Sequence, residues 1–193
     1  MMFENIMEIL NNQPLSDGDN MELNVIKLLG ESSFVVKDIV DEVIGDYKKT
    51  SMYIATPTCD WKCCKEGGFD ISICQNSRIA KKDNIYISIK DIYDRYIHNG
   101  LTHAIVIGGL EPFLHFDELK SLILYFRLMF CNDDIVIYTG YEEKEIRNKV
   151  KELEQFENII IKYGRFKLNA PHRFDEVLGV ELASDNQYAV KIS

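Results

Sequence analysis

Short apolar runs alternate with amphipathic stretches through most of this chain. The apolar runs cover residues 51–56, 103–107, 134–138 and 158–162. Between them, apolar residues recur at helical spacing over 88–99, 117–131 and 142–155. Strands that are apolar throughout are typical of a parallel sheet covered on both faces, and parallel neighbours need crossover helices. The sequence therefore predicts an α/β fold with a mostly parallel sheet.

Length and charge restrict the function classes. The 193 residues suffice for one domain with a full core. Acidic residues outnumber basic ones by 31 to 22, so a nucleic-acid partner is not expected. No apolar run approaches the roughly 20 residues of a membrane span, and the N-terminus shows no secretory pattern. We therefore expect a cytoplasmic protein without a membrane partner.

Residues 1–20 differ in character from the rest of the chain. Apolar residues recur at helical spacing over 3–10, and a polar, turn-rich stretch follows over 13–20. We interpret 1–20 as an N-terminal extension with a possible helix, and 21–193 as the α/β domain.

Each predicted strand is followed by an unusual loop. A cysteine-rich segment, 57–76, follows the first strand, and Gly-Gly-Leu-Glu-Pro at 108–112 follows the second. Tyr-Thr-Gly-Tyr at 138–141 and Tyr-Gly-Arg-Phe at 163–166 follow the other two. In α/β sheets, ligands bind outside the carboxyl ends of the strands. The four loops therefore predict one composite site at that edge.

The cysteine segment indicates a metal centre. It holds Cys59, Cys63, Cys64 and Cys74, and in a reducing compartment such a cluster favours metal binding or catalysis over disulfides. The segment has no CxxC pair, and adjacent Cys63 and Cys64 can hardly both reach one metal. It thus offers about three ligands, whereas a structural zinc site takes four. Three thiolates on a [4Fe–4S] cluster would leave one iron open; a zinc site or buried thiols remain alternatives.

Several motifs together resemble one family. The Cys59-x3-Cys63 spacing and the order of the strand-end loops resemble radical S-adenosylmethionine (SAM) enzymes, in which CxxxCxxC follows the first strand. Residues 108–112 resemble that superfamily's GGEP motif with one residue inserted. Within the superfamily the chain resembles the small activating proteins of anaerobic ribonucleoside-triphosphate reductase, through Tyr-Thr-Gly-Tyr at 138–141, a DGxF-like 163–166 and an SSNQ-like 184–187. The matches run in order over about 51–193.

The resemblance carries implications for fold and site. It implies a radical SAM-type partial (β/α) barrel with a [4Fe–4S] cluster on Cys59, Cys63 and Cys74. It favours Cys74 because Cys-Gln-Asn at 74–76 resembles the activases, and it leaves the choice between Cys63 and Cys64 open. The implied SAM-binding residues are Gly108, Gly109, Glu111, Thr139 and Asn186.

The resemblance also implies an activity. The enzyme would cleave SAM reductively to a 5′-deoxyadenosyl radical and abstract hydrogen from a glycine of a glycyl-radical enzyme, such as the anaerobic reductase. A low-potential donor such as flavodoxin or ferredoxin would supply the electron. Two alternatives stay open. One is a radical SAM enzyme acting on a small molecule or another protein, and the other is a non-catalytic zinc-binding module.

Overall fold

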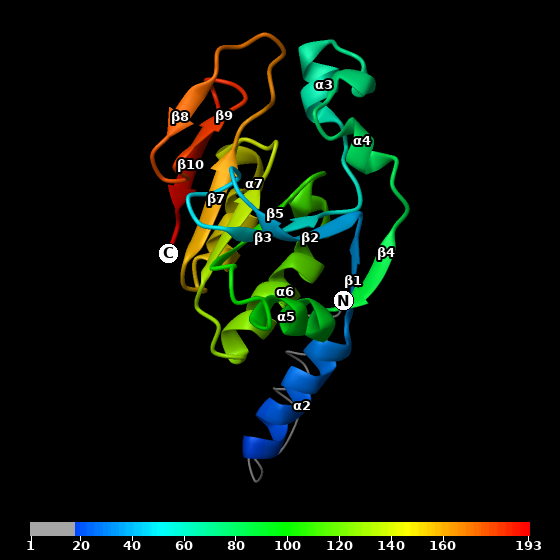
Figure 1. Cartoon of the computed structure of the whole chain (residues 1–193), viewed down its shortest axis with the longest axis vertical. Helices are drawn as coiled ribbons and strands as arrows, with labels where there is room; N and C mark the ends of the chain where they lie inside the picture. The colour runs from blue at the N-terminus through cyan, green and yellow to red at the C-terminus, as the bar shows by residue number, and fades with distance from the viewer. Residues whose placement is uncertain (1–17) are drawn as a thin grey trace.

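A six-stranded sheet forms the centre of the computed structural model, which describes residues 18–193. Its strand order is β10-β7-β6-β5-β3-β2 (Figure 1). The four inner strands run parallel, and they are β3 (Ser51–Ala55), β5 (Ala104–Gly108), β6 (Asp134–Tyr138) and β7 (Ile159–Tyr163). The edge strands β2 (Asp38–Val43) and β10 (Tyr188–Lys191) are antiparallel to their neighbours. The predicted mostly parallel α/β sheet is confirmed, and the described residues form no closed barrel because both edges stay open.

Helices pack on one face of this sheet. They are α2 (Gly18–Glu31), α5 (Ile89–Ile97), α6 (Phe116–Leu128) and α7 (Glu143–Leu153). Their apolar residues share one core cluster with Ile54, Ile107 and Ile137 of the strands. Such burial is the main favourable term in folding.

The other face of the sheet is covered without helices. Val106 and Val136 pack there against Tyr47 of the β2–β3 loop and against Leu178 and Leu182. The last two residues belong to the segment of β8 (Arg173–Asp175) and β9 (Val180–Leu182). The prediction of cover on both faces is therefore met by a loop and a hairpin, which explains why the strands are apolar throughout.

The predicted helices form for local reasons. The Ser88 hydroxyl accepts a 3.0 Å hydrogen bond from the Asp91 amide and caps α5, as the sequence predicts. Glu142 and Glu145 form a capping box at the start of α7. The helices begin and end within a few residues of the predicted bounds.

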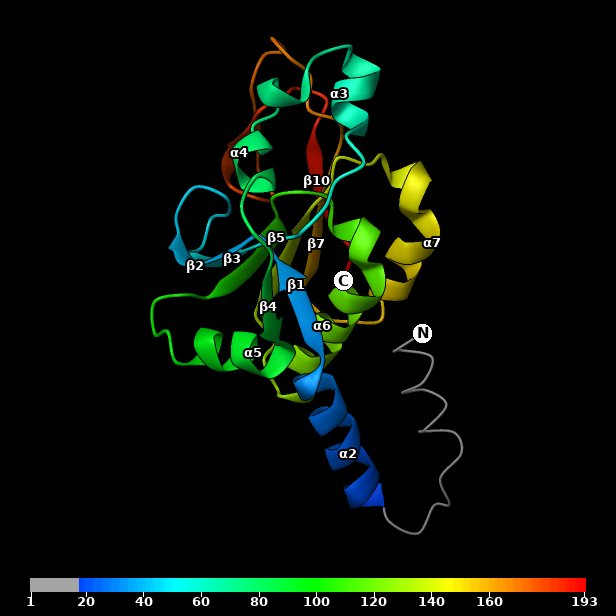
Figure 2. The same cartoon turned by 90° about the vertical axis from the view of Figure 1, so that its right-hand side faces the viewer.

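Other elements lie where the sequence gives weak patterns. A two-stranded ladder joins β1 (Ser33–Val36) to β4 (Ile85–Ser88), and the two lie side by side in Figure 2. The cysteine segment contains α3 (Lys62–Gly67) and the 3₁₀ turn η1 (Ile71–Ile73), followed by α4 (Ser77–Ala80). A second 3₁₀ turn, η2 (Pro112–His115), precedes α6.

The predicted boundary after residue 20 falls inside α2. The apolar residues expected at helical spacing over 3–10 lie outside the described residues. Among the helices that the structure describes, none has the length and apolar character needed to cross a membrane.

Candidate functional site

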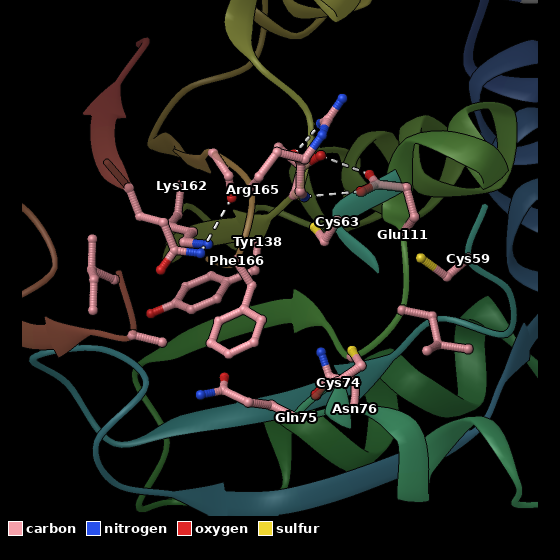
Figure 3. Close-up of a pocket in the computed structure, with 18 of the residues that line it drawn as sticks. Cys59, Cys63, Cys74, Gln75, Asn76, Glu111, Tyr138, Lys162, Arg165 and Phe166 are labelled. Carbon is pink, nitrogen blue, oxygen red and sulfur yellow. Dashed lines mark hydrogen bonds between the residues drawn. The ribbon is translucent and has the colours of Figure 1, made fainter. Parts of the chain in front are cut away.

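A cavity of about 370 Å³ lies at the carboxyl ends of the parallel strands (Figure 3). The loops after β3, β5, β6 and β7 all contribute to its lining. The β2–β3 loop and β9 complete its wall. Parallel topology brings these strand ends to one edge, so segments far apart in sequence form a single site.

Four of the five cysteines line this space, namely Cys59, Cys63, Cys64 and Cys74. Figure 3 shows the sulfur atoms of Cys59, Cys63 and Cys74 around the cavity. The Cys59 sulfur accepts a 3.3 Å hydrogen bond from the Trp61 amide. Burial raises the pKa of the Cys59 thiol to about 12 and also raises the pKa of Cys63. Binding of a metal centre would oppose this shift, because coordinated thiols are deprotonated.

The two other cysteines have different surroundings. Cys64 is the buried residue of α3, and its thiol lies beside that of Cys74. Cys63 instead lies against the loop after β6, where a Cβ added to Gly140 would be 3.0 Å from its sulfur. Cys131 lies at the end of α6 near Asp133, and it does not line the cavity. Of the adjacent pair, Cys63 is therefore the residue that faces the strand ends.

The donor set fits an iron–sulfur cluster, whose usual protein ligands are thiolates. Within residues 18–193, no three His, Cys, Asp or Glu side chains are grouped so that they could hold one metal ion. The sulfurs of Cys59, Cys63 and Cys74 are spread around the cavity (Figure 3). A cubane cluster binds each thiolate through a different iron, so it needs sulfurs spread around a cavity. A zinc ion would need its ligands gathered around one centre.

Glu111 is held firmly at the cavity wall. Its side chain is 3% exposed. One carboxylate oxygen accepts hydrogen bonds from the Thr139 hydroxyl at 2.7 Å and from the Phe113 amide at 3.1 Å. The other oxygen accepts a 2.9 Å hydrogen bond from the Gly140 amide. Burial nevertheless raises the pKa of this carboxyl to about 7. Glu111 therefore lines the cavity and also ties the loop after β5 to the loop after β6.

The other residues predicted to contact the cofactor are placed unequally. Gly109 and Thr139 line the cavity, whereas Gly108 and Asn186 do not. The Asn186 amide group donates a 3.0 Å hydrogen bond to the carbonyl of Arg165, and its neighbour Gln187 lines the cavity instead. Gly109 has φ +77°, and an added Cβ would be 2.8 Å from the Cβ of Ala55. A side chain at 109 would thus disturb β3 as well as the cavity.

Lys162 is a cavity residue that the sequence analysis missed. It lies near the end of β7, is 7% exposed and lines the cavity. Among the described residues its ammonium has no hydrogen bond or ion pair, and it lies 5.6 Å from the ring centre of Tyr138. Burial lowers its pKa to about 8. A single lysine directly after the apolar residues 159–161 was the available indication, since a buried charge without a partner marks a functional site.

These features define a class of protein, an α/β domain with a cysteine-lined cofactor cavity at its strand ends. A family model described as a 4Fe-4S single cluster domain matches residues 32–187. The chain belongs to this family, which is found in radical SAM-related proteins. The match indicates a cluster-binding domain and a possible redox enzyme. No curated protein and no solved structure matches the chain.

Proposed function

We propose that this protein is a radical SAM enzyme that cleaves SAM reductively to generate a 5′-deoxyadenosyl radical. The observation that carries the proposal is the convergence of three cysteine sulfurs, the Glu111 carboxylate and the unpartnered Lys162 ammonium on one cavity. In this proposal the open sheet is a shortened partial barrel, with helices outside and the cavity at its carboxyl end.

Cys59, Cys63 and Cys74 hold the cluster in this proposal, which leaves one iron for the amine and carboxylate of SAM. When bound, the cluster and SAM supply the electron-transfer and radical chemistry, while the protein supplies binding and orientation. A cluster held by three cysteines has the open position that a ligand needs.

The protein groups suit the charges of SAM. The carboxylate of SAM can pair with the Lys162 ammonium, because that ammonium has no anionic partner among residues 18–193. The Glu111 oxygen that accepts from Gly140 has a remaining lone pair for the SAM amine. Because Gly109 has no side chain, a ligand can approach the backbone closely at this part of the cavity wall.

The partner that we propose is a glycyl-radical enzyme such as an anaerobic ribonucleoside-triphosphate reductase, with flavodoxin or ferredoxin as electron donor. Support comes from the Tyr-Thr-Gly-Tyr segment, which places Thr139 and Gly140 at the cavity wall.

The test is anaerobic purification and reconstitution with iron and sulfide, followed by incubation with SAM and a strong reductant. We expect a brown protein and reductant-dependent formation of 5′-deoxyadenosine. The matched pair of variants is Cys63→Ala, which should abolish product, and Cys131→Ala, which should not. A colourless protein that binds zinc, or a brown one that forms no 5′-deoxyadenosine, would contradict the proposal.

A further inference from the structure

The segment between the second and third proposed ligands has little packing of its own. Ten residues separate Cys63 from Cys74. In α3 only Cys64 is buried, and η1 buries no residue. Segments with few buried apolar contacts open easily, and ordering a long loop costs conformational entropy. Contacts from outside the segment must therefore hold it in position.

Arg165 supplies the strongest of these contacts. It follows β7, is 7% exposed, lines the cavity and reaches α3. Its guanidinium binds both carboxylate oxygens of Glu66, at 2.9 and 3.1 Å. It also binds Glu145 of α7 at 2.8 Å and donates to the carbonyl of Gly140. One side chain thus joins the cysteine segment to α7 and to the loop after β6.

Phe166 adds a second contact from the next position. Its backbone lies close to the Cys63 sulfur. Its ring meets Phe69, just beyond α3, edge to face with 5.8 Å between centroids. An added Cβ at Gly67 would be 2.5 Å from the Phe69 ring, so glycine is needed there for that ring position.

Lys62 secures the first turn of α3 through the same partners. Its ammonium lies 3.0 Å from Glu145 and 4.5 Å from the ring centre of Tyr141. The Arg165 guanidinium lies 5.5 Å from the same ring. Both ends of α3 are therefore tied to α7 by way of Glu145 and Arg165.

We infer that Arg165, together with Phe166, is a positioning residue that keeps α3 and Cys63 in place for the cluster before the cluster binds. Arg165 acts through Gly140, whose backbone lies against the Cys63 sulfur, and through Glu66 on α3. A bidentate guanidinium contact is directional, and the point charge of lysine replaces it only in part. The inference rests on the proposed function only in naming Cys63 as a ligand.

The test is hydrogen–deuterium exchange of the reduced, iron-free protein, read on peptides within 60–76. Arg165→Gln should speed exchange there by about tenfold or more, since charged hydrogen bonds of this kind contribute about 1.5–3 kcal/mol. Arg165→Lys should recover part of the protection. The control is Arg127→Gln, because Arg127 instead binds the carbonyls of Cys131, Asp133 and Glu157. It should leave exchange in 60–76 unchanged even where it lowers the melting temperature.

Reconstitution gives a second measurement. Arg165→Gln should retain less iron per chain and change the electron paramagnetic resonance line shape of the reduced cluster, and Arg165→Lys should restore both in part. If Arg165→Gln does not fold, Glu66→Gln removes the same contact from the exposed side, with the same expectation.

Two outcomes are decisive. Wild-type exchange within 60–76 in the folded variant would overturn the inference. Faster exchange in the variant, combined with a wild-type protein that takes up no iron, would support the positioning role and contradict the proposed function.

Discussion

The Thr139 hydroxyl lies 2.7 Å from the Glu111 carboxylate, and this hydrogen bond joins the loops that follow β5 and β6. With the amides of Phe113 and Gly140, it gives the buried carboxylate three donors. These bonds favour the ionised form and oppose the effect of burial, which dominates and raises the pKa of Glu111. The shape of the cavity wall thus depends on a side chain that itself lines the cavity.

Replacing Thr139 tests this connection. Thr139→Val keeps the shape but removes a donor from a buried carboxylate, so the free energy of unfolding should fall by about 1–3 kcal/mol. Urea denaturation at neutral pH measures this change. Thr102→Val is the control, because Thr102 is also buried but makes only a 3.4 Å hydrogen bond to the Asn99 carbonyl. Equal losses in the two variants would contradict the prediction.

Iron retention in alanine variants should distinguish the cysteines that bind the cluster from those that do not. Alanine at position 59, 63 or 74 should each abolish iron retention after anaerobic reconstitution, because a cluster on three thiolates loses a bond to the protein in every case. Cys64→Ala and Cys131→Ala should keep the iron, measured per chain together with the visible absorbance. Loss of iron in Cys64→Ala with retention in Cys63→Ala would reverse the assignment.

Gly140 tests the space around Cys63. In Gly140→Ala the new methyl would lie 3.0 Å from the Cys63 sulfur, closer than van der Waals contact allows. Iron retention should therefore fall while the fold stays intact by circular dichroism. Gly100→Ala is the matched control, since an added Cβ there meets nothing within 4 Å. If both variants retain iron equally, Cys63 does not depend on this close approach.

Lys162 links ligand binding to stability. Lys162→Met should weaken SAM binding to the reconstituted protein at least tenfold, while iron content stays unchanged. Equilibrium dialysis measures the affinity, and unaltered affinity would remove Lys162 from the binding site.

The same variant has a pH signature. The folded pKa of Lys162, about 8, lies below its value in the unfolded chain, so the folded state loses its proton first. Wild-type stability should therefore gain a contribution as pH rises from about 8 to about 10. Lys162→Met should lack this gain, and identical pH profiles of unfolding would contradict the lowered pKa.

The sequence alone determined the main elements, because their causes are local. Runs such as 134–138 and the Ser88 cap contain the information for a strand or a helix start within a few neighbouring residues. Parallel pairing then requires that the loops after the strands meet at one edge, so the grouping of Cys59, Gly109 and Thr139 was predictable.

Only the tertiary structure decided the rest, because those features depend on partners distant in sequence. Lys162 turns into the cavity while Asn186 turns away to Arg165, and neither orientation follows from its neighbours. The short edge strands pair through long-range contacts and carry weak local patterns. The contact of Arg165 with Glu66 spans 99 positions and joins the loop after β7 to α3, the helix that follows β3. Packing across the sheet determines such contacts, and they produce no periodic pattern in the sequence.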